Sequence, residues 1–107
     1  MNLKNLSIYL IKDKEKLIIT CTNDIPTYQV NIPVFSPAAI NTAITNFFSV
    51  YRKSLENNLV DIKLLNLDNN YPYTIIQNIN PQLYCSDSNI RDQVREYLRK
   101  NCIKGDN

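Results

Sequence analysis

The chain of 107 residues carries twelve Lys and Arg against ten Asp and Glu, so its formal net charge is only +2. This small charge does not by itself indicate a nucleic-acid partner. With 44% hydrophobic residues, a chain of this length can bury one core, which predicts a single domain over residues 1–107.

The sequence lacks residues that several kinds of catalytic, metal-binding and phosphate-binding sites require. There is no histidine, so neither a Ser-His nor a Cys-His nucleophile pair can form. Three widely spaced cysteines favour neither a disulfide framework nor a zinc site, and the single glycine leaves no phosphate-binding loop. We therefore expect a non-enzymatic protein without a cofactor or metal.

The sequence also bears on location and origin. The apolar run within residues 1–14 is too short for a signal peptide, and no stretch approaches the roughly twenty apolar residues of a membrane span. We expect a cytoplasmic protein with reduced cysteines and no membrane partner. Many Asn, Ile, Lys and Tyr residues, whose codons are AT-rich, suggest a phage, a mobile element or a low-GC bacterium.

Three strands are predicted first, as a meander. Residues 6–12 and 17–23 are rich in β-branched side chains and are separated by a polar loop of hairpin length. Residues 27–34 alternate, with one set expected to face the core: Tyr28, Val30, Ile32 and Val34. The flanking Pro26 and Pro33 cannot donate ladder hydrogen bonds, which favours an edge strand that could pair with a second copy.

A long helix is predicted next, with Ser36 as the N-cap and Pro37 in the first helical position. Apolar residues at helical spacing form one stripe: Ile40, Ala43, Ile44, Phe47, Phe48, Tyr51 and Leu55. Asn41, Thr42 and Thr45 are expected on the opposite, polar side. Packing of the apolar stripe must hold this helix, because many of its polar residues are poor helix formers.

The remaining segments predict strands at 59–67 and 71–79, a loop at 80–85, and a last helix that opens within residues 86–89. The order βββαββα indicates an α+β fold, with a five-stranded, mainly antiparallel sheet and two helices packed on it. This element order resembles the core of the class I type III secretion chaperones, which implies an adaptor-like role. The additional first helix of that family has no counterpart here.

Asp61 and Lys63 flank Ile62 in a predicted strand, the Asp-x-Lys arrangement of metal-dependent nucleases. There a carboxylate holds Mg²⁺ and a lysine contacts the scissile phosphate. Such a site also needs a second carboxylate on a paired strand, whereas Glu56 and Asp24 are expected in a helix and a turn. Two solvated residues of an alternating strand are the simpler interpretation, so the nuclease is our least favoured hypothesis.

The last helix carries Arg91, Arg95 and Arg99 at four-residue spacing, which places them on one side; we call them the arginine row. Residues 86–104 contain five basic and three acidic residues, whereas the rest of the chain has seven of each. Asp92 and Glu96 can form i,i+3 ion pairs with the row, and the like charges at i,i+4 offset that gain. A solvated helix face is the plain interpretation, and an acidic partner is the functional one.

Two tyrosines flank a proline at the start of the fifth strand. Tyr71 and Tyr73 could contribute to an interface, or they could pack as ordinary aromatic residues of a sheet. The candidate partner-binding residues are therefore Arg91, Arg95, Arg99, Lys100, Tyr71 and Tyr73.

These observations lead to one main functional hypothesis. We expect a small protein-binding module with an acidic protein as its partner, such as a stoichiometric inhibitor, an immunity protein or an anti-defence protein. The alternatives are a nucleic-acid-binding protein that uses the arginine row, or a chaperone-like adaptor. A homodimer is a further expectation.

Overall fold

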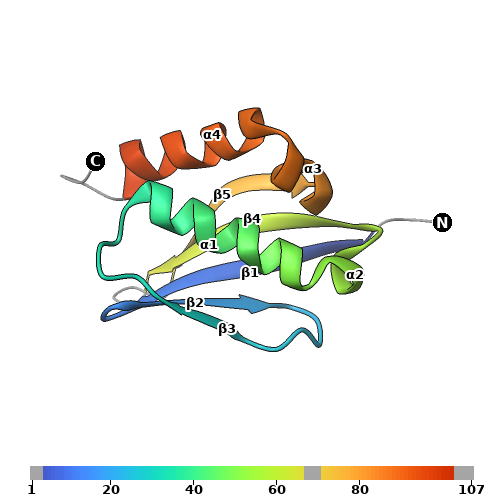
Figure 1. Ribbon diagram of the computed structural model, residues 1–107, viewed down its shortest axis with the longest axis horizontal. Helices are drawn as coiled ribbons and strands as arrows, with labels where there is room; N and C mark the ends of the chain where they lie inside the picture. The colour runs from blue at the N-terminus through green and yellow to red at the C-terminus, as the bar shows by residue number, and fades with distance from the viewer. Residues whose placement is uncertain (1–3, 67–70, 103–107) are drawn as a thin grey trace.

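The computed structural model describes residues 4–66 and 71–102 and shows an α+β fold (Figure 1). The strands are β1 (Lys4–Asp13), β2 (Lys16–Cys21), β3 (Tyr28–Asn31), β4 (Asn58–Asn66) and β5 (Tyr71–Ile79). The helices are α1 (Pro37–Val50), α2 (Arg52–Leu55), α3 (Pro81–Ser86) and α4 (Ser88–Tyr97), followed by the π-helical turn η1 (Leu98–Cys102). The expected fold class and the expected order of strands and long helices are confirmed.

The five strands form one sheet in the order β3-β2-β1-β4-β5. The β1–β2–β3 meander and the edge position of β3 are as predicted. The central pair differs from our simplest expectation, because β1 and β4 are parallel while the other three pairs are antiparallel. The helical segment between β3 and β4 provides the crossover that a parallel pair requires.

The helices lie together on one side of the sheet (Figure 1), and the core fills the space between these layers. Alternate residues of the central strands point into it, such as Ile8 and Leu10 of β1 and Ile62 of β4, all fully buried. The predicted apolar stripe of α1 packs against them, and its members from Ile40 to Leu55 belong to the core or contact it. Burial of these side chains is the main stabilising contribution.

Three local expectations were wrong. Val34 is exposed rather than on a buried strand face, because β3 already ends at Asn31. Residues 81–86 form α3 rather than a loop, since the Asn80 side chain accepts hydrogen bonds from the backbone N–H groups of Gln82 and Leu83. Asn41, expected on the polar side of α1, is buried between helices.

The N-terminal cap of α1 can be tested by substitution. The Ser36 hydroxyl accepts a hydrogen bond from Ala39 N–H at 3.2 Å, and Pro37 occupies the first turn. Ser36→Ala should lower the free energy of unfolding by about 1 kcal/mol, because the cap is lost. Urea denaturation measures this change, and Ser49→Ala, at an exposed position of the same helix, should cause no loss. Equal effects of the two substitutions would contradict the assigned cap.

Candidate functional site

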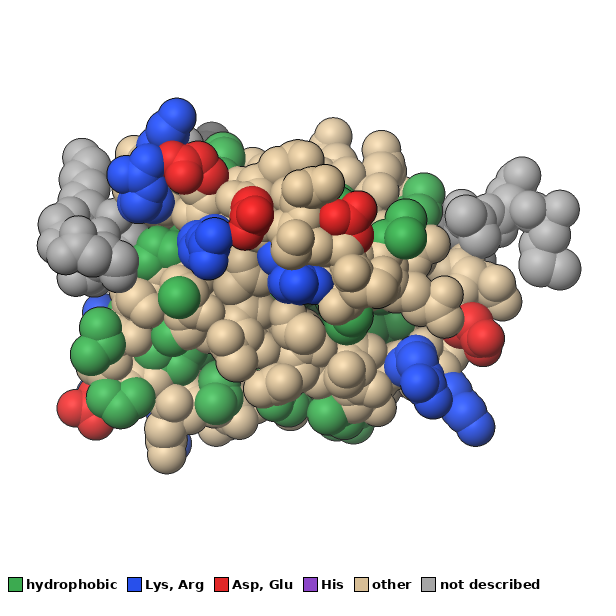
Figure 2. Space-filling model, turned by 45° about the horizontal axis from the view of Figure 1, so that its top comes forward, with side chains coloured by type: hydrophobic (Ala, Val, Ile, Leu, Met, Phe, Trp, Pro, Cys, Tyr) green, Lys and Arg blue, Asp and Glu red, His purple; other side chains and the backbone are tan. Residues whose placement is uncertain are grey.

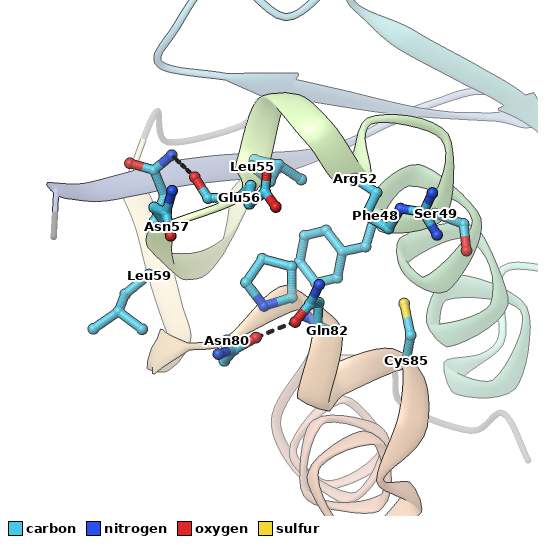
Figure 3. A pocket seen from close by; sticks show the side chains of 12 residues that line it. Phe48, Ser49, Arg52, Leu55, Glu56, Asn57, Leu59, Asn80, Gln82 and Cys85 are labelled. Atoms are coloured by element: carbon cyan, nitrogen blue, oxygen red, sulfur yellow. Dashed lines mark hydrogen bonds between the residues drawn. The ribbon is translucent and has the colours of Figure 1, made fainter.

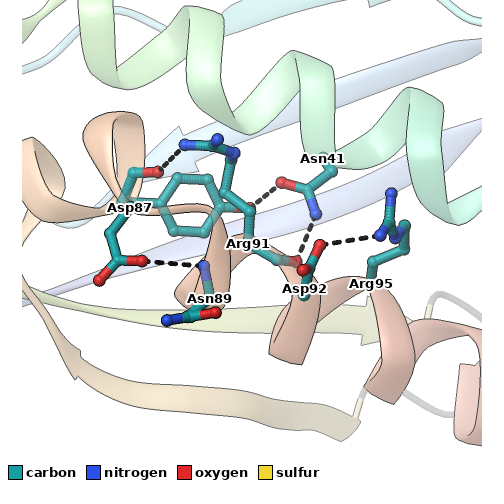
Figure 4. A network of polar contacts seen from close by, with 7 residues as sticks. Asn41, Asp87, Asn89, Arg91, Asp92 and Arg95 are labelled. Carbon is teal, nitrogen blue, oxygen red and sulfur yellow. Dashed lines mark hydrogen bonds and ion pairs between the residues drawn. The ribbon is translucent and has the colours of Figure 1, made fainter.

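The last helix is fixed to the rest of the molecule by a buried hydrogen-bond network (Figure 4). The Tyr84 hydroxyl of α3 donates to Asn41 Oδ1 of α1, and Asn41 Nδ2 donates to the Arg91 carbonyl oxygen of α4 at 2.7 Å. Tyr84 is fully buried, and its ring meets Phe48 edge-on at a centroid distance of 5.2 Å. One polar side chain thus connects three helices.

The first member of the arginine row belongs to this network. Arg91 Nη1 donates to the carbonyl oxygens of Tyr84 and Cys85 at 2.7 and 2.8 Å. These carbonyls lie near the end of α3, where the helix leaves acceptors without intrahelical partners. The guanidinium of Arg91 therefore holds α3 against α4, and sequence periodicity alone did not distinguish it from the other two arginines.

The other two arginines project from the surface and form the ion pairs that the spacing predicted. Arg95 pairs with Asp92 at 2.8 Å, and Arg99 pairs with Glu96. All four side chains are about half exposed. The hydrogen bond from Arg99 holds the pKa of Glu96 below its usual value. Lys100 is also exposed. Figure 2 shows the resulting alternation of basic and acidic side chains across this face.

A groove of about 540 Å³ lies between α1 and α4, beside Arg91 and Arg95. Most of its lining residues are polar, among them Thr42 and Asn46 of α1 and Arg91, Asp92 and Arg95 of α4. The groove thus places hydroxyl and amide groups next to Arg95. Sequence analysis missed this contribution of α1, because its polar positions showed only that they avoid the sheet.

Of the two tyrosines, only Tyr73 has a described side chain. Tyr73 lies in β5 and its side chain is 45% exposed, whereas the Tyr71 side chain lies outside the described residues. β5 is an edge strand, so Tyr73 is accessible.

A second hollow, of about 490 Å³, opens between the end of α1, α2, the start of β4 and α3 (Figure 3). Arg52 and Glu56 bring one charge of each sign to its wall, and Asn80 and Gln82 add amides. The thiol of Cys85 also lines it, and donates to the Thr45 carbonyl oxygen with a sulfur–oxygen distance of 3.8 Å. The hollow has no charge bias that would define a ligand class.

Asp61 and Lys63 have structural partners. Asp61 accepts hydrogen bonds from Asn78 N–H at 2.9 Å and from Asn5 Nδ2 at 3.3 Å, next to an irregularity in the β4–β5 register. Asn78 has a φ of 59°, a conformation that asparagine tolerates better than most residues. Lys63 Nζ lies 5.7 Å from the centroid of the Tyr9 ring. Among residues 4–66 and 71–102, no three Cys, Asp or Glu side chains are grouped to hold a metal ion.

Comparisons with protein-family models, with curated proteins and with solved structures find no match to this chain. The resemblance to type III secretion chaperones thus rests on element order alone. Within the part of the chain that the structure describes, no helix is both long and apolar enough to cross a membrane.

The different environments of the arginines predict different effects of substitution. Arg91→Ala should lower the free energy of unfolding by about 2 kcal/mol, because two partly buried carbonyl groups lose a charged donor. Arg95→Ala removes only an exposed ion pair and should stay within about 0.5 kcal/mol of the wild type. Urea denaturation of both variants measures the difference, and equal losses would contradict the structural role of Arg91.

Ionisation of Tyr84 gives a pH test of the network. Burial raises the pKa of its phenol, so the folded state keeps this proton where the unfolded chain has lost it. The contribution of this group to stability should be constant below about pH 10 and fall as the pH rises further. In denaturation at alkaline pH, the unfolding free energy of Tyr84→Phe should therefore fall less steeply than that of the wild type. Parallel curves would show that Tyr84 ionises normally when folded.

Proposed function

We propose that this protein is a non-enzymatic module that binds an acidic segment of another protein through Arg95, Arg99 and Lys100, here called the α4 basic strip. The carrying observation is that these three side chains are exposed near the end of the last helical segment: Arg95 lies on α4 and lines the groove between α1 and α4, and Arg99 and Lys100 lie on η1, which continues α4. The groove offers hydrogen-bonding groups to a peptide lying along the strip.

The ion pairs within the helix support this proposal rather than oppose it. An exposed ion pair contributes about 0–1 kcal/mol, so a carboxylate of a partner can replace Asp92 or Glu96 at little cost. Arginine can bind such a carboxylate through two parallel hydrogen bonds, which adds geometric selectivity. The interleaved Asp92 and Glu96 also weaken the field that a phosphate backbone would meet, which favours a protein over a nucleic acid.

Arg91 has a different part in this proposal. Arg91 and Asn41 tie α4 to α3 and α1 through hydrogen bonds, and these contacts hold the helix that carries the strip. A surface held rigid before binding loses less conformational entropy when a partner binds. Arg91 is thus a positioning residue, and Arg95, Arg99 and Lys100 are the contacting residues.

The biological role that we propose is a stoichiometric inhibitor, an immunity protein or an anti-defence protein of a phage or mobile element, acting in the cytoplasm. It is supported by the composition of the sequence, which lacks histidine and is rich in Asn, Ile, Lys and Tyr, residues with AT-rich codons. A chaperone-like adaptor would use the same surface.

The test is selection of a displayed random-peptide library on the purified protein. We expect enrichment of peptides rich in Asp and Glu. Their affinity should fall at least about tenfold for the double variant Arg95→Gln, Arg99→Gln, because each arginine contributes a charged hydrogen bond. The matched control, Arg52→Gln with Lys53→Gln, removes two exposed charges from α2 and should leave the affinity unchanged.

Two outcomes would contradict the proposal. In one, the selected peptides carry no acidic bias, or bind both double variants alike. In the other, the protein binds random-sequence DNA or RNA with an affinity that falls steeply with salt and depends on Arg95 and Arg99. That result would replace the acidic peptide by a phosphate backbone.

A further inference from the structure

The side of the sheet that faces away from the helices carries an apolar patch. Strand residues alternate between the two sides, so the neighbours of the core residues point outward: Tyr9, Ile11, Ile18 and Leu65 among them. We call this outward side the open face. All the described helices lie on the other side (Figure 1), and these four side chains are only partly buried.

Strand register brings these residues together. Ile11 of β1 lies opposite Ile18 of β2 on one side and Leu65 of β4 on the other, so three aliphatic side chains form a row across the central strands. Tyr9 lies two residues along β1 and pairs with Lys63. Single exposed apolar residues are ordinary, whereas a contiguous group on an uncovered sheet is a candidate interaction surface.

We propose that a second copy of this chain covers the open face, so that two sheets pack face to face in a homodimer. The charges around the apolar row support an identical partner. Asp13 and Lys16 are cross-strand partners beyond one side of the row, and Asp61 and Lys63 lie beyond the other. A two-fold axis along the apolar row would bring Asp13 and Lys16 of one copy to the end that carries Asp61 and Lys63 in the other copy, so that charges of opposite sign can pair across a two-fold interface.

The size of the face fits a dimer. Strands spaced about 4.8 Å apart, with a rise of about 3.3 Å per residue, give five strands of this length a face of roughly 600 Å². Specific interfaces bury about 600–1,000 Å² on each partner, so the open face lies at the lower end of that range. Packed sheets lie about 10 Å apart, which leaves room for the outward side chains of both copies.

The sheet edges are less suited to self-association, although we expected pairing there from the sequence. β3 has only four residues and is followed closely by Pro33, and β5 pairs with β4 through two irregularities of register. Short strands, nearby proline and bulges are features that protect sheet edges from pairing. The sheet face, rather than its edge, is therefore the dimer surface.

Sedimentation equilibrium of the purified full chain tests this proposal. The wild type should associate to a dimer at micromolar concentrations. Ile11→Lys should raise the dissociation constant at least about a hundredfold, because it buries a charge at the centre of the interface. Ile11→Thr keeps a β-branched residue in the strand and should raise it about tenfold, so the test holds even if the lysine variant folds poorly.

The matched controls are Val34→Lys and Val50→Lys, which introduce the same charge at exposed apolar positions away from the open face. Both should dimerise as the wild type does. A wild type that stays monomeric up to the highest soluble concentration would overturn the proposal. So would a dimer that tolerates both Ile11 variants.

This inference does not rest on the proposed function. The α4 basic strip lies on the helical side of the sheet, so Arg95→Gln with Arg99→Gln should leave the dimer intact. Failure of either proposal would leave the other standing.

Discussion

The hydrogen bond between the Tyr84 hydroxyl and Asn41 is the contact on which the arrangement of the helices depends. This hydrogen bond lies in the core, where an unpaired polar group costs about 1–3 kcal/mol. Displacement of α1 or α3 would therefore leave a buried polar side chain without a partner. Asn41 Nδ2 donates to the Arg91 carbonyl oxygen of α4, and the Arg91 guanidinium donates to the Tyr84 carbonyl oxygen of α3. The direction in which α4 presents its outer surface follows from these few contacts.

Much of the fold was predictable because it rests on local patterns. Alternation identified the strands, Ser36 with Pro37 marked the start of α1, and i,i+3 spacing gave the Arg95–Asp92 ion pair. The helix α3 was missed although Asn80 and Pro81 repeat the same start signal, because six residues carry too little periodicity. The role of Asn41 could not be predicted, since it depends on Tyr84, 43 residues further along the chain.

The same distinction applies to the candidate site. Periodicity placed three arginines on one side of a helix, and it treated them as equivalent. Tertiary packing separates them, because Arg91 lies where the carbonyls of α3 need a donor, while Arg95 and Arg99 lie beyond α3 in solvent. In these two proposals, the helical side of the molecule binds an acidic partner and the open face joins two copies. A dimer of this kind would present two α4 basic strips, which increases avidity for a partner with repeated acidic segments.

The most direct test of the central claim is chemical-shift mapping of the isotope-labelled protein during titration with a selected acidic peptide. We expect the largest changes at Arg95, Arg99 and Lys100 and at the groove residues Thr42 and Asn46, while the strands remain unperturbed. Changes centred on the open face or on the hollow beside Arg52, with α4 unaffected, would contradict it.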